Sequence, residues 1–215
     1  MLRFFAILLL ASPALAQSVS DIARQVDRRY NHLQSMESNF TEIYRGAGGI
    51  DRTESGALYL KRPGKMRWDY REPRPKLFLS DGRTAWFYVP GEQQARKTSV
   101  KKLEDLRSPI RYLLGKTRLE KEFAALSLAP DVKPLDSGDV VLRGIPKGME
   151  DRVDEVLLEI TPGRRIRRIV IQEADGSTTE FRFSDEKENV PIADSRFRFT
   201  PPPGVEVVEA GDLAP

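Results

Sequence analysis

The sequence predicts a mainly β protein of the α+β class, with a curved antiparallel sheet, a helix at its start and a helical insertion in its middle. Residues 18–37 place apolar side chains three and four positions apart, which is the spacing of one helix face. In residues 40–98, and again after residue 138, apolar and polar residues alternate with a period of two, and turn sequences separate the runs. Short antiparallel strands in chain order predict a meander that curls into a barrel or a sandwich.

The first 16 residues have the features of a secretory signal peptide. Arg3 supplies the positive start, residues 4–10 form an apolar run too short to span a membrane, and Ala14, Leu15 and Ala16 form a small-residue cleavage site. We expect cleavage after Ala16 and a single exported domain spanning residues 17–215. The sequence has no cysteine, so it predicts neither a lipid-anchored chain nor a disulfide.

The helix predicted in residues 18–37 has a clear start signal. Ser18 or Ser20 fits the N-cap, and Asp21 lies near the positive end of the helix dipole. The apolar face consists of Val19, Ile22, Val26, Tyr30, Leu33 and Met36.

The strands that follow are predicted from alternation and from their turns. The separating sequences are GAGG, PG, EPRP and DG, all of which favour turns. The predicted strands before the insertion are residues 39–45, 56–62, 65–71, 76–80 and 83–89. Those after it are residues 139–146, 153–161, 164–173, 177–184 and 196–204.

The insertion, residues 100–123, changes back to helical spacing. Its apolar residues include Leu103, Leu106, Ile110, Leu113 and Leu114, and Pro109 interrupts the pattern. We therefore expect two short helices there rather than one.

A basic run, RRIRRIV at residues 164–170, allows two interpretations. Plain alternation places Arg165, Arg167 and Ile169 on one face of a strand. The other face receives Arg164, Ile166, Arg168 and Val170. The run is either a charged strand at the sheet rim or a docking patch for an acidic partner or a membrane surface.

Composition and motifs exclude several function classes. Without Arg3 the chain has 34 basic and 32 acidic residues, a near-neutral balance that argues against nucleic-acid binding. Its one histidine is His32, it has no cysteine nucleophile, and neither a GxSxG nor an HExxH motif occurs. We expect a protein that is not an enzyme and uses no cofactor or metal.

The segment LYLKRPGKMRWDYREP, residues 58–73, contains an unusual charge. Leu58, Leu60 and Arg62 alternate onto one face of a strand, so an arginine continues a stripe of leucines that should face the core. Pro63 keeps the residue before it extended, which fixes that direction.

This segment, together with LSDGRTAWFYVPGEQQ (79–94) and FRFTPPPGVEV (197–207), closely resembles the LolA-type periplasmic carriers of outer-membrane lipoproteins. The segments occur in the family's order, on a chain of the family's length. The resemblance implies a half-open, curved antiparallel β-barrel whose hydrophobic cavity is covered by a helical lid. It also implies a monomer in the periplasm that binds the acyl chains of lipoproteins. The cargo comes from an inner-membrane ABC transporter of the LolCDE type and passes to an outer-membrane LolB-type receptor.

The resemblance also assigns roles to residues. Arg62 is the arginine that holds the empty lid shut by bonding lid-helix backbone. Alternation independently places it at the mouth of the interior, where it reaches free carbonyls at a helix C-terminus or extends its side chain to the sheet rim.

The acyl-chain cavity is expected to be lined from several strands and from the lid. Alternation leaves open whether Trp86 with Tyr88, or Ala85 with Phe87 and Val89, faces inward. A solidly packed core is the alternative for every candidate. The candidates are Leu58, Leu60, Met66, Trp68, Leu77, Leu79 and Trp86 from strands and Ile110, Leu113 and Leu114 from the lid.

A second function class fits a similar fold. A periplasmic lipoprotein-sensing regulatory domain would bind the same acylated ligand, but such sensors usually carry a second domain. A lipid-anchored receptor is disfavoured because the chain has no cysteine.

Overall fold

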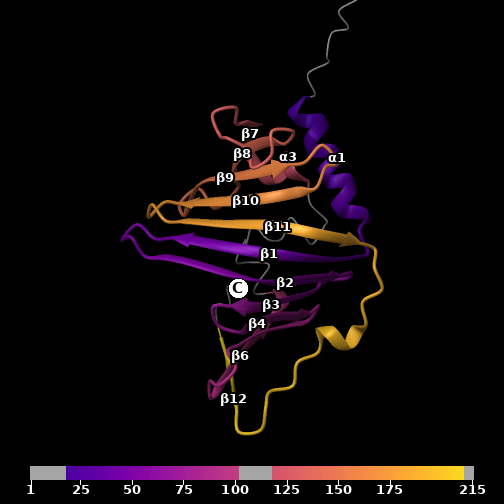
Figure 1. Ribbon diagram of the computed structural model, residues 1–215, viewed down its shortest axis with the longest axis vertical. Coiled ribbons are helices and arrows are strands. Elements are labelled where there is room, and N and C mark those ends of the chain that lie inside the picture. The colour runs from indigo at the N-terminus through magenta and orange to yellow at the C-terminus, as the bar shows by residue number, and fades with distance from the viewer. Residues whose placement is uncertain (1–17, 102–117, 211–215) are drawn as a thin grey trace, which may run out of the picture.

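The computed structural model describes residues 18–101 and 118–210, which form one twisted, curved sheet of 12 strands (Figure 1). The strand order is β12-β6-β5-β4-β3-β2-β1-β11-β10-β9-β8-β7. Neighbours are antiparallel except β12 and β6, which are parallel. Strands β12 and β7 lie at opposite ends of this order, so the sheet is unclosed. The predicted mainly β, half-open architecture is confirmed.

The elements follow the chain in two groups of strands. The helices are α1 (Val19–His32) and α3 (Leu119–Glu122), and Asp194–Phe197 forms a 3-10 helix, η2. The first strands are β1 (Ser35–Arg45), β2 (Asp51–Lys61), β3 (Lys65–Glu72), β4 (Lys76–Asp81), β5 (Thr84–Tyr88) and β6 (Gln94–Ser99). The others are β7 (Phe123–Leu128), β8 (Val140–Pro146), β9 (Val153–Ile160), β10 (Ile166–Glu173), β11 (Thr178–Glu188) and β12 (Glu206–Glu209). Within residues 18–101 and 118–210, no helix is long and apolar enough to cross a membrane.

Helix α1 begins as the sequence predicts but ends at His32 rather than at residue 37, and Met36 lies in β1. Ser18 is the N-cap, and its hydroxyl accepts the amide of Asp21 at 3.1 Å. Ile22, Val26 and Tyr30 are buried in the main core together with the inward side chains of β1–β3 and β8–β11. We call the sheet face that carries this core the inner face and the opposite one the outer face.

Two predictions about the strands are wrong. Residues 196–204 form η2 and an extended segment rather than a strand, because Pro201, Pro202 and Pro203 have no amide to donate to a sheet. Strand β12 follows them and pairs with β6. Strands β6, β7 and β12 were missing from the predicted set.

Other predictions fall outside the described residues. The signal peptide, its cleavage site after Ala16 and the lid candidates Ile110, Leu113 and Leu114 lie there. These stay predictions.

The basic run differs from plain alternation because β10 is irregular. The β10–β9 register shifts between Ile166 and Arg168, so Ile166 and Ile169 both face the main core. Arg168 instead lies on the outer face, where its guanidinium is 2.7 Å from Glu159 and 3.8 Å from Glu180. Arg168 is therefore paired within the sheet.

Candidate functional site

Arg62 follows β2, and its side chain lies against the last turn of α1. Its Nε donates to the carbonyl of Leu33, and its Nη2 donates to the carbonyl of Tyr30 at 2.7 Å. Its amide donates to the carbonyl of Gln34 at 2.9 Å. The last carbonyls of a helix have no partner within the helix. Arg62 therefore satisfies the end of α1 and ties it to the sheet.

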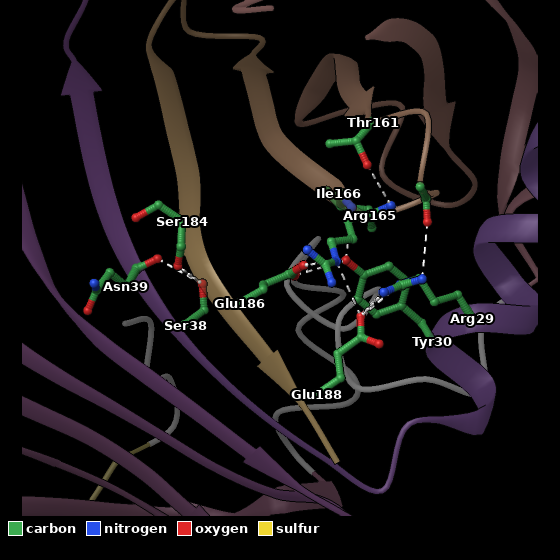
Figure 2. A network of polar contacts seen from close by, with 11 residues as sticks. Arg29, Tyr30, Ser38, Asn39, Thr161, Arg165, Ile166, Ser184, Glu186 and Glu188 are labelled. Carbon is green, nitrogen blue, oxygen red and sulfur yellow. Dashed lines mark hydrogen bonds and ion pairs between the residues drawn. The ribbon is translucent and has the colours of Figure 1, made fainter. Parts of the chain in front are cut away.

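Tyr30 is held on its other side by β10 and β11. Its hydroxyl accepts the amide of Ile166 at 2.9 Å and donates to Glu186 at 3.3 Å. Figure 2 shows Tyr30, Arg165 and Glu186 gathered where β10 begins and β11 runs past it. The backbone and the side chain of one tyrosine thus connect α1 to β2, β10 and β11.

Ion pairs surround this tyrosine. Arg29 on α1 bonds Glu188 and also donates to the carbonyl of Gly163 at 3.1 Å. Arg165 lies 3.4 Å from Glu186 and 3.7 Å from Glu188. Burial raises the pKa of Glu186 and raises the pKa of Tyr30 well above its usual value. The hydroxyl of Tyr30 is therefore neutral and available as both donor and acceptor.

The inner wall contains four of the candidate acyl-chain residues. Register pairs Leu58 with Trp68 and Leu60 with Met66, and all four are buried in the main core. Trp68 packs edge-on against Phe40, with ring centroids 4.7 Å apart. The structure therefore brings these residues together on the inner face, in the core cluster that also contains the buried residues of α1, and their role in acyl binding stays a prediction.

The space beside Arg62 is small. Residues at the end of α1 and the start of β3 enclose about 20 Å³ there, which is room for about one water molecule. An acyl chain entering at this point requires the end of α1 to move.

Three candidates do not lie on the inner wall. Trp68 is paired with Phe78, so Phe78 faces inward and its neighbours Leu77 and Leu79 face outward. Trp86 pairs with Leu79 and packs on Phe199 with ring centroids 5.4 Å apart. The inward prediction for Leu77, Leu79 and Trp86 is wrong. The inward set on β5 is Ala85 and Phe87, which the alternation had left open.

The physical reason for the error is that β4 is covered on both faces. η2 contacts β3 and β4 from outside, so Leu77, Phe78 and Leu79 are all buried. A continuous apolar run gives no sign of which residues face the interior.

A polar group on the inner face was not predicted. At the end of β2 far from Arg62, the Tyr70 hydroxyl donates to Glu42 at 2.6 Å, and Lys76 bonds Glu54 at 2.7 Å. Burial raises the pKa of Glu42 and that of Tyr70. Glu186 and Glu188 were missed too, since they occur in the run DEKEN, which is typical of a solvated strand end.

These features define a class of protein: an unclosed β-sheet with an apolar core on its inner face and a helix that joins this core and is attached to the sheet by a few polar contacts. A family model described as "Outer membrane lipoprotein carrier protein LolA" matches residues 31–200. The chain belongs to this family, as its resemblance in sequence predicted.

Individual proteins named as lipoprotein carriers are similar to this chain in sequence. An outer-membrane lipoprotein carrier protein of Alkalilimnicola ehrlichii is 31% identical over 202 residues, which cover 93% of this chain and 88% of the relative. One from Nitrosospira multiformis is 32% identical over 161 residues, 74% of each chain.

Solved structures share the fold. An uncharacterized conserved protein from Thermus thermophilus has a TM-score of 0.58 at 14% identity, over 90% of this chain and 100% of that one. The lipoprotein LppX of Mycobacterium tuberculosis has a TM-score of 0.53 at 15% identity, over 81% of this chain and 97% of that one.

Proposed function

We propose that this protein is a periplasmic carrier that binds the acyl chains of lipoproteins between α1 and the inner wall and delivers them across the periplasm. The observation that carries the proposal is the attachment of α1. Its buried residues Ile22, Val26 and Tyr30 belong to the same core cluster as Leu58 and Trp68, and Arg62 secures its end through carbonyl contacts. Polar contacts at an end of a helix can break without unfolding the sheet.

Energetics favour such an arrangement in a carrier. Burying one CH₂ contributes about 0.8 kcal/mol, so part of an acyl chain contributes on the order of 10 kcal/mol before entropy costs. A cover that prefers the closed state offsets part of this affinity, because binding must open it. Cargo then stays bound during transit and still leaves when an acceptor binds it more tightly.

The partners follow from the same function. The carrier takes cargo from an inner-membrane ABC transporter of the LolCDE type and passes it to a LolB-type receptor on the outer membrane. It acts as a monomer and catalyses no reaction on its cargo.

The test is native mass spectrometry of the mature protein mixed with one purified lipoprotein, in acylated and de-acylated forms. The expected result is a one-to-one complex with the acylated form alone. Equal binding of both forms would identify a surface that recognises the polypeptide. Absence of any complex would mean that the inner face does not open to acyl chains.

A further inference from the structure

A cleft lies beside α1, where Arg29 is part of its lining. Its volume is about 450 Å³, within the range of small-molecule sites. It is lined by Arg29, Thr161, Gly163, Arg165, Ile166, Arg167, Phe183, Ser184, Asp185 and Glu186.

The cleft exists because β10 and β11 separate. Their pairing begins only at Arg168 with Arg182, and before that point β10 has no partner on β11. The amide of Ile166 bonds the hydroxyl of Tyr30 in place of a strand carbonyl (Figure 2). A side chain of α1 therefore occupies a position that a sheet normally fills with backbone.

The lining combines two chemistries. Ile166 and Phe183 are members of the main core, so the floor of the cleft is continuous with the apolar inner face. Arg29, Arg165 and Glu186 line the cleft with charged groups. An apolar floor beneath charged donors and acceptors suits a ligand that is apolar at one end and polar at the other.

An unpaired donor lies further inside. The ring of Trp68 is 6.4 Å from that of Phe183, and its indole N–H has no hydrogen-bond partner within residues 18–101 and 118–210. A buried donor without an acceptor is costly, and an ester or amide carbonyl of a ligand would satisfy it.

We propose that this cleft holds the polar end of the acylated cargo, its ester and amide groups and the first residues of the polypeptide, while the acyl chains pass over Phe183 and Ile166 to the inner wall. The proposal rests on the carrier function. Arg29 and Arg165 donate to the cargo's carbonyls, and Glu186 and Glu188 keep these arginines in position. The polypeptide leaves the carrier through the gap between β10 and β11.

Site-specific photo-crosslinking tests the location. p-Benzoylphenylalanine replaces Ser184 or Thr161 at the cleft, and Gln34 at the small space beside Arg62 as the matched control. Each protein is loaded with an acylated lipoprotein, irradiated, and the cross-linked peptide is identified by mass spectrometry. We expect links from Ser184 and Thr161 to the first residues of the cargo and background yield from Gln34.

A second measurement reports loading independently. The chain has two tryptophans, so Trp86→Phe leaves Trp68 as the only one, and Trp86 lies on the outer face. Brominated acyl chains on the cargo should quench Trp68 fluorescence. Quenching with only background links from Ser184 and Thr161 would overturn the cleft and leave the carrier function standing. If the acylated cargo neither binds nor quenches, the carrier function fails and this proposal fails with it.

Discussion

Replacing Arg62 with leucine removes the attachment of α1 while keeping an apolar stem. Two bonds from the guanidinium to the carbonyls of Leu33 and Tyr30 are lost. Bonds from a charged donor contribute about 1.5–3 kcal/mol each, and the partial exposure of Arg62 favours the lower value. The expected loss is therefore about 3 kcal/mol of preference for the closed state.

That loss has a measurable consequence. Since 1.4 kcal/mol is a factor of ten, the ratio of closed to open protein falls about 100-fold. Arg62→Leu should bind acylated lipoprotein at least as tightly as the wild type and release it to a purified LolB-type receptor about 100-fold more slowly. The assay follows a fluorescently labelled lipoprotein as it moves from loaded carrier to receptor.

The matched control is Arg67→Leu. Arg67 lies on the neighbouring strand, but it bonds Asp69 at 2.7 Å and the carbonyl of Arg196 at 3.0 Å, away from α1. It should transfer cargo at the wild-type rate. Wild-type affinity and wild-type transfer by Arg62→Leu would refute the role of Arg62 as a latch.

Two further predictions concern stability. A Cβ on Gly56 would lie 1.9 Å from the carbonyl oxygen of Asp69, so Gly56→Ala should lower the melting temperature sharply, whereas Gly48→Ala, with open space around it, should not. A melting temperature equal to that of Gly48→Ala would contradict this. Burial raises the pKa of Glu42, so its ionised form costs stability above the folded-state pKa, and this cost disappears as the pH falls through that pKa. Glu42→Gln keeps an acceptor for Tyr70 and should resist urea better at neutral pH, with a smaller difference in mild acid; an unchanged difference would count against it.

Apolar spacing, helix caps and turn sequences were sufficient to predict the helices and strands that have a clear period and a clear boundary. The spacing in α1 and the Ser18 cap predicted the start of that helix, although it ends at His32 and not at residue 37, and the turn sequences predicted most strands. Strand β6 was missed because QARKTS buries only Ala95 and Thr98. It is a strand because β5 pairs with it on one side and β12, which lies far along the chain, pairs with it on the other.

The direction of side chains was predictable only where one face is polar. Arg62 could be placed by alternation with Leu58 and Leu60, and it reaches the helix end that the sequence suggested. Leu77 and Leu79 could not be placed, because η2 covers their outer face and hides the alternation. The gap beside Ile166 was equally hidden, since a register shift follows from pairing and not from residue type.

Tyr30 gives the latch and the cleft a common physical basis. Its carbonyl is held by Arg62 and its hydroxyl by Ile166 and Glu186, so one residue of α1 is fixed at both of its polar ends. We propose that releasing the carbonyl lets the last turn of α1 move and draws the hydroxyl away from the amide of Ile166. In the proposed carrier cycle, opening near Arg62 would then also free this amide at the gap between β10 and β11. The movement that admits the acyl chains to the interior would therefore also open the cleft that holds the polar end of the cargo.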